Sequence, residues 1–213
     1  KFTAHFVWLE GGSLMLEKIK GLFKKILGIF NIEITRATKK PTVFFETDTE
    51  FNRIYLTALK KTQVLHSDNL QKRQRNFILI QLVTQASSVI NNGNVAECGC
   101  WRGASAFQIA YRLKERNFKN KFFIFDSFEG LSDFKEEDLQ NNFAVDYEKK
   151  KKEFACPLSI VKNNLKDFDF IEYKKGWIPS RFGEVANFLF SFVHIDVDLY
   201  HPIKDSLEFF YPR

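Results

Sequence analysis

The pattern of hydrophobic and polar positions along the chain changes at Gly93. Before this residue, apolar side chains recur every three or four positions, as they do on one face of a helix. After it, short apolar runs alternate with amphipathic stretches, which predicts a parallel β-sheet covered by helices on both faces. The expected strands span residues 94–98, 121–126, 169–173 and 189–196.

Two helices with similar start signals are expected before Gly93. Thr47 and Glu50 have the spacing of a capping box, which satisfies free backbone N–H groups at a helix start and predicts a helix over about 48–61. Asp68 repeats this spacing with a glutamine three residues later, ahead of a second helix. That helix is expected to end at an Asn-Asn-Gly sequence, where glycine adopts the left-handed conformation readily.

The N-terminal segment 14–30 places apolar residues at helical spacing with lysines between them, which predicts a basic amphipathic helix. Such a helix packs against a protein core or rests on an anionic membrane surface, and we favour packing because helices of this kind commonly cover a core. Residues 1–14 are expected to be a tag, a linker or a misassigned start, since they contain Glu-Gly-Gly-Ser ahead of Met15. The expected domains are an N-terminal extension, 1–45, and one α/β domain, 46–213.

The composition of the chain favours a globular protein and argues against a nucleic-acid partner, a disulfide framework and a membrane span. Of the 213 residues, 45% are hydrophobic and 27% charged, a balance typical of folded globular proteins. The net charge of +6 comes from lysines in separate clusters, so no nucleic-acid partner is expected. The three cysteines, an odd number, do not suggest disulfides and favour a reducing cytoplasm. No apolar run approaches the roughly 18 residues of a membrane span.

A glycine turn follows the first expected strand. Gly99 and Gly103 allow a tight turn and close approach of a ligand, and the helix after them directs its free N–H groups to the same place. Glu97, however, puts a negative charge beside this turn that would repel a pyrophosphate. The third glycine of the dinucleotide-binding fingerprint is also missing. The turn therefore argues against a nicotinamide-dependent oxidoreductase.

Asp126 ends the second expected strand. An acidic residue at this place, 20 to 30 positions past the glycine turn, can accept hydrogen bonds from both ribose hydroxyls of an adenosine. Together with Glu97 it favours a nucleoside that is cationic and carries no phosphate. S-adenosylmethionine (SAM), with its sulfonium and amino groups, has these properties.

Four sequence blocks carry a family resemblance. In chain order they are VAECGCWRGASA (95–106), FDSFEGL (125–131), KKGWI (174–178) and HIDVDLYHPIKDSLEFFYP (194–212). They resemble the successive blocks of the macrocin O-methyltransferase (TylF-like) family. The resemblance covers about residues 70–213 and implies a Rossmann-like class I methyltransferase fold over the 46–213 domain. It also implies SAM- and Mg²⁺-dependent methylation of a hydroxyl of a sugar or glycosylated metabolite.

The resemblance also assigns site residues at the carboxyl ends of the strands. The residues expected to hold the cofactor are Glu97, Gly99, Gly103, Ser105, Asp126, Ser127, Gly176 and Trp177. The first four would line its methionine end, the next two its ribose, and the last two its adenine. Asp196 is the expected catalytic residue and magnesium ligand, and Asp198 lies beside it as a second candidate ligand.

The chemistry of methylation explains why a metal would lie at this strand end. A divalent ion lowers the pKa of a coordinated hydroxyl and fixes the acceptor oxygen in line with the sulfonium. His194 precedes Asp196 by two positions and would lie on the same face of the strand. It is either a general base or a hydrogen-bonded core histidine, and the second role is favoured.

The family pattern continues beyond the last block with another strand and an Asp-Asp-Tyr block that completes the metal site. We therefore expect this chain to lack C-terminal strands, either as a fragment of a longer, active methyltransferase or as a truncated product. A truncated product would leave Asp196 as a lone metal ligand, and we expect this exact chain to bind the cofactor weakly and turn over little or nothing. The resulting sheet edge would favour association into a homo-oligomer. Two other functions stay open: a Rossmann-type NAD-dependent oxidoreductase, and a non-catalytic protein that binds SAM or a membrane surface.

Overall fold

The computed structural model describes residues 44–89, 93–140 and 147–213. The chain divides into two compact units, Lys1–Thr47 and Asp48–Arg213. Of the first unit only residues 44–47 are described, and they include a short 3₁₀ helix, Phe44–Glu46. The predicted amphipathic helix at 14–30 lies outside the described part of the chain, as does the expected helix stop immediately before Gly93.

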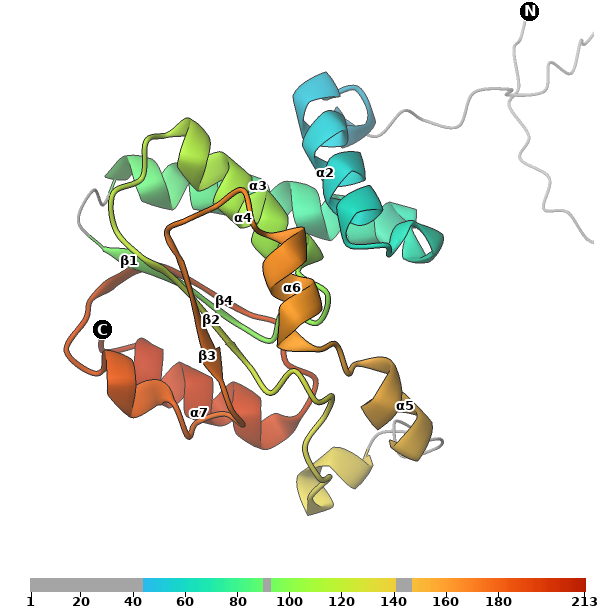
Figure 1. Cartoon of the computed structure of the whole chain (residues 1–213), viewed down its shortest axis with the longest axis vertical. Coiled ribbons are helices and arrows are strands. Elements are labelled where there is room, and N and C mark those ends of the chain that lie inside the picture. Colours follow the sequence, from blue (N-terminus) through green and yellow to red (C-terminus); the bar gives the residue numbers. More distant parts are fainter. Residues whose placement is uncertain (1–43, 90–92, 141–146) are drawn as a thin grey trace, which may run out of the picture. The chain divides into compact units, whose positions relative to one another are not determined.

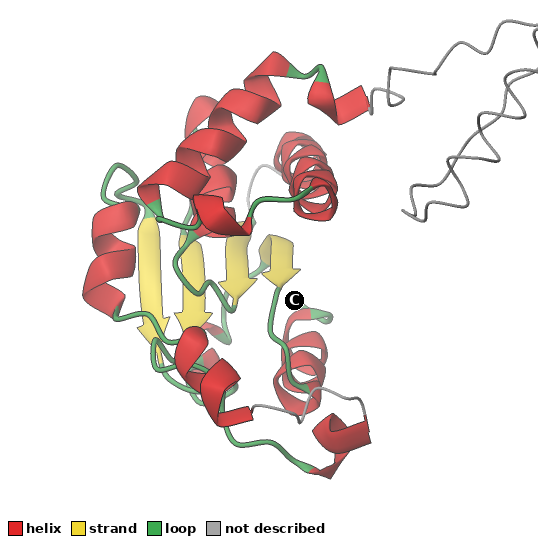
Figure 2. Ribbon diagram, turned by 90° about the vertical axis from the view of Figure 1, so that its right-hand side faces the viewer, coloured by secondary structure: helices red, strands yellow, loops and turns green. Residues whose placement is uncertain are grey.

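The described residues of the second unit form a four-stranded parallel sheet in the order β3-β2-β1-β4 (Figure 1). The strands are β1 (Asn94–Cys98), β2 (Phe122–Asp126), β3 (Ile171–Lys175) and β4 (Phe190–Ile195). Figure 2 shows helices on both sides of the strands. The predicted Rossmann-like α/β fold is therefore confirmed.

Strand β3 begins two residues later than the sequence pattern predicts. The aromatic residues just before it serve the preceding turn: Phe168 packs edge-on against Phe107, and Phe170 against Phe118. The pairing of Ile171 with Phe122 on β2 then sets the start of the strand. A run of apolar residues alone does not show whether a phenylalanine belongs to a strand or packs in the turn before it.

Helices α3 (Leu70–Val89) and α4 (Ala104–Glu115) cover one face of the sheet, with α2 (Thr49–Lys61) packed against them, and α7 (Tyr200–Phe210) covers the other face (Figure 1). Helices α5 (Tyr147–Glu153) and α6 (Leu158–Asn164) lie between β2 and β3 in the chain. None of the described helices is both long enough and apolar enough to span a bilayer.

The N-terminal caps of α2 and α3 differ from the prediction by one residue each. Asp48, not Thr47, caps α2, because its side chain accepts a hydrogen bond from the backbone N–H of Phe51 at 2.8 Å. Asn69 does the same at α3 for Lys72, at 2.9 Å. Asp68 is instead engaged by a guanidinium and a phenol, as described below.

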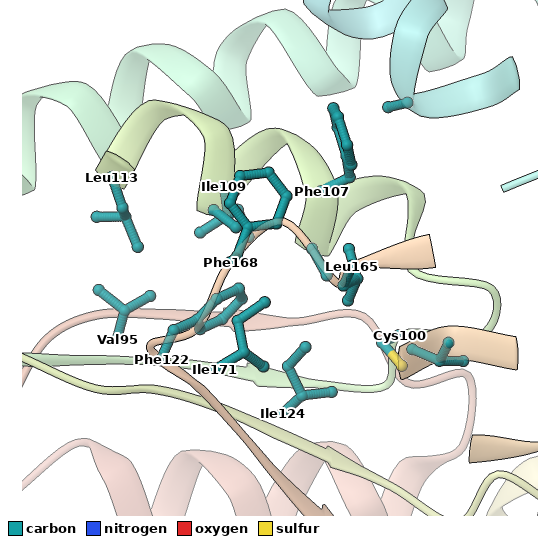
Figure 3. Close-up of a cluster of buried hydrophobic side chains, with 14 of the residues drawn as sticks. Val95, Cys100, Phe107, Ile109, Leu113, Phe122, Ile124, Leu165, Phe168 and Ile171 are labelled. Carbon is teal, nitrogen blue, oxygen red and sulfur yellow. The ribbon is translucent and has the colours of Figure 1, made fainter. Parts of the chain in front are cut away.

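Strand residues alternate between two buried clusters. Val95, Phe122 and Ile124 face α4, where Ile109 and Leu113 cover them (Figure 3). The alternate residues of the same strands, among them Phe123 and Phe125, face α7. There they form a second buried cluster with Phe182 and Phe210. The sheet is thus held between two apolar layers, which fixes the positions of its strand ends.

All three cysteines are free and buried, as expected for small residues in and beside the core. Burial raises the pKa of the Cys98 thiol to about 12, so this residue is inert at neutral pH.

Candidate active site

A cavity of about 350 Å³ opens at the carboxyl ends of the strands. Each strand contributes to its wall, through Gly99 after β1, Asp126 on β2, Gly176 after β3 and Asp196 after β4. Chain order reverses between β1 and β4, the place where open α/β sheets bind ligands. The volume falls in the range of small-molecule sites.

The glycine turn after β1 is shaped by the neighbouring strand end. Gly99 has a φ of +81°, and a Cβ atom placed on it would lie 2.4 Å from the backbone oxygen of Asp196. The backbone N–H of Asp196 in turn donates to the carbonyl of Cys98 at 2.9 Å. A side chain at position 99 would therefore separate the two strand ends that form the cavity floor.

The carboxylate of Asp126 holds this turn in place. Its Oδ2 atom accepts the backbone N–H groups of Cys100 at 2.7 Å and Trp101 at 3.2 Å. Its Oδ1 atom accepts the N–H of Phe128 at 2.7 Å. A carboxylate has about four acceptor sites, so these bonds leave room for a ligand hydroxyl on the side that lines the cavity.

Glu97 does not line the cavity, contrary to the prediction. Its side chain is fully buried on an interior strand beneath α3 and α4, and its Oε1 lies 2.9 Å from Nδ1 of His194, the paired position on β4. Among the described residues Oε2 has no hydrogen-bond partner. Burial raises the pKa of Glu97, against the opposing effects of His194 and of the Ser105 hydroxyl.

His194 is the member of this pair that lines the cavity. Burial alone lowers the pKa of His194, but the hydrogen bond to Glu97 and its charge outweigh burial, so the pKa is raised. The positive charge of Arg75 acts in the opposite direction. The favoured role of a hydrogen-bonded histidine thus agrees with the geometry.

Gly103 also lies outside the cavity wall. It precedes α4 with a φ of +86°, and its nearest neighbours are the side chains of Leu165 and Val161 near α6. It shapes the start of the helix but does not approach a ligand. Ser105, one turn further on, does line the cavity.

The adenine end predicted for the cavity contains Gly176 and Trp177, both of which line it. The Trp177 side chain is 40% exposed, so its ring is accessible to a ligand. Ser127 also lines the cavity, but its hydroxyl already donates to the carbonyl of Gly130 at 2.8 Å and accepts the N–H of Glu129 at 3.1 Å. Its visible role is to hold the turn after β2.

Asp196 and Asp198 are exposed on the cavity wall after β4. Within the described ranges, no three His, Cys, Asp or Glu side chains gather closely enough to hold a metal ion. The residues present thus do not build a site for a resident Mg²⁺, and the predicted magnesium ion stays a prediction.

The wall opposite the strand ends was not anticipated from the sequence. Helix α3 faces the cavity with Lys72, Arg75, Asn76 and Leu79. These positions have the spacing of one helical face, but most are polar. In a sequence, such a cavity wall is indicated by lysine or arginine at positions of a helix face that otherwise contains apolar residues.

A parallel sheet with a ligand cavity at its switch point defines a Rossmann-like α/β protein. The chain belongs to the macrocin-O-methyltransferase (TylF) family, whose family model matches residues 55–213. No protein of curated function matches the chain in sequence.

Two solved structures share the fold. The O-methyltransferase NovP is 21% identical with a TM-score of 0.52, and the match covers 66% of this chain and 60% of NovP. The calicheamicin methyltransferase CalS11 is 19% identical with a TM-score of 0.57, over 95% of this chain and 75% of CalS11. The chain therefore spans 60% of the length of NovP.

Proposed function

We propose that the protein is a SAM-dependent O-methyltransferase that acts on a hydroxyl of a sugar or glycosylated small molecule. Membership of the TylF family supports the reaction, and the O-methyltransferase NovP and the calicheamicin methyltransferase share the fold. The observation that carries the proposal is the position of Asp126. Its carboxylate fixes the glycine turn and lines the cavity at the place where an adenosine ribose binds in such sheets.

In the reaction the acceptor oxygen attacks the methyl carbon of the sulfonium, the S–CH₃ bond breaks with its electron pair left on the sulfur of S-adenosylhomocysteine, and the hydroxyl proton passes to solvent water. The negative charges of Asp196 and Asp198 on the cavity wall favour a cationic donor. The cavity also aligns donor and acceptor, and orientation supplies much of the rate of such transfers. Because the described carboxylates do not form a magnesium site, no step is assigned to a metal.

The remaining assignments follow from the same function. The acceptor is a small molecule, and the three free, buried cysteines support a reducing cytoplasm. A homo-oligomer and a membrane contact through 14–30 stay predictions. No observation favours the NAD-dependent alternative.

Calorimetric titration with S-adenosylhomocysteine and with NAD⁺ separates the two cofactors. We expect saturable binding of the first and none of the second. The variant Trp177→Ala should weaken S-adenosylhomocysteine binding roughly ten-fold, since a ring stacked on a base contributes about 1–3 kcal/mol. Tyr211→Ala, at a 94% exposed side chain outside the cavity, is the control. Tighter binding of NAD⁺ would contradict the proposal.

A further inference from the structure

Helix α3 carries an unusual concentration of positive charge at its start. Lys72 and Arg73 lie in its first turns and Arg75 follows, while the first turn contains no acidic residue. The amino end of a helix carries a partial positive charge, so cations there are unfavourable unless an anion lies nearby.

Only one of these cations is neutralised by a described residue. Arg73 forms an ion pair with Asp68 at 2.6 Å. Lys72 and Arg75 make no ion pair with any side chain in the described ranges, although both line the cavity. An anionic group of a bound ligand would offset both charges.

The sheet order indicates which part of the donor lies beside α3. Asp126 and Trp177 line the cavity at the β2 and β3 ends, where the proposed function places the adenosine. The opposite end of the donor then extends past β1 towards β4, against which α3 packs. Arg75 of α3 and His194 of β4 line the same cavity, which places Arg75 at this end.

We propose that Lys72 and Arg75 bind the carboxylate of the methionine end of SAM. This inference rests on the proposed function. It assigns the single negative charge of the donor to the basic α3 wall, and its positive charges to the acidic wall formed after β4 by Asp196 and Asp198. The cavity then matches a zwitterion, with each end of the aminoacyl group facing the opposite charge.

The test is a comparison of two ligands on matched variants. One ligand is S-adenosylhomocysteine, and the other is its decarboxylated analogue, which lacks only that carboxylate. Lys72→Met and Arg75→Gln should each weaken S-adenosylhomocysteine binding about ten-fold or more and leave the affinity for the analogue nearly unchanged, because a hydrogen bond to a charged group contributes about 1.5–3 kcal/mol. Arg75→Lys should restore part of the affinity.

Lys119→Met is the control, since it removes the same charge from an exposed position at the other end of the strands. Thermal unfolding of each variant shows that it is folded. Equal weakening of both ligands, or unchanged binding of S-adenosylhomocysteine, would overturn the carboxylate site. Failure of the unmodified protein to bind either ligand would instead contradict the proposed function, and the inference with it.

Discussion

At the scale of single residues, the cavity depends on side chains that shape the backbone as much as on those that face a ligand. Gly99 allows the ends of β1 and β4 to approach each other, and Asp126 ties three backbone N–H groups around the same turn. Gly99 and Asp126 belong to the first two of the four sequence blocks from which a cofactor site was predicted. Their contacts in the protein itself show that the site is preorganised before a ligand binds.

Replacing Gly99 by alanine should destabilise the protein by about 2–4 kcal/mol, because a Cβ is strained at positive φ and would collide with the backbone of Asp196. Urea unfolding measures the change. Gly183→Ala is the matched control, since its Cβ would meet no atom within 4 Å. A Gly99→Ala protein as stable as the control would show that the close approach of the strand ends is wrong.

The sequence located most of the candidate site residues but not the directions of their side chains. Spacing places Glu97 and Gly103 at the turn, yet the partner of Glu97 is 97 residues away on β4. Gly103 lies against Leu165 and Val161, which are also distant in sequence. Contacts between distant segments decide which side of the turn faces a ligand, and a short motif carries no information about them.

At the scale of elements, α2 and α3 are joined by a polar contact. Asp68 precedes α3, accepts the Tyr55 hydroxyl of α2 at 2.9 Å and pairs with Arg73 of α3. The same two helices supply the cavity wall opposite the strand ends. The stability of this contact therefore affects the shape of the site.

Asp68→Asn should lower the free energy of unfolding by about 1–3 kcal/mol at pH 7. The hydrogen bonds from Arg73, against the effect of burial, lower the pKa of Asp68 in the folded protein. A lowered folded-state pKa contributes stability that is present above the unfolded value of about 4 and is lost as pH falls through the folded value. The difference between the unmodified protein and the variant should therefore shrink below about pH 4.

Denaturant titrations between pH 7 and pH 3 measure this difference. The control is Asp167→Asn, whose exposed pair with Lys61 is screened by solvent and should contribute little. A pH-independent effect of Asp68→Asn would mean that the contact does not depend on the carboxylate charge.

At the scale of the whole molecule, the alternation of apolar runs and helical stretches was sufficient to predict the sheet. Strand β1 has the predicted bounds, β2 begins one residue later than predicted, and β4 is one residue shorter at each end. The cavity wall formed by α3 was not predicted, because the polar residues that line it are single positions in the helix and form no recognisable motif. Its assembly against the strand ends is a property of the tertiary fold.

Binding of an adenosyl donor at the strand ends is tested most directly by NMR mapping of S-adenosylhomocysteine on the isotope-labelled protein. The expected shifts are those of amides at the cavity, in residues 72–79, 99–101, 104–105, 126–127, 176–178 and 196–198, while those of residues 117–120, at the opposite ends of the strands, stay unchanged. Saturating ligand that leaves the cavity amides unmoved, or that shifts residues 117–120 instead, would contradict a donor site in this cavity.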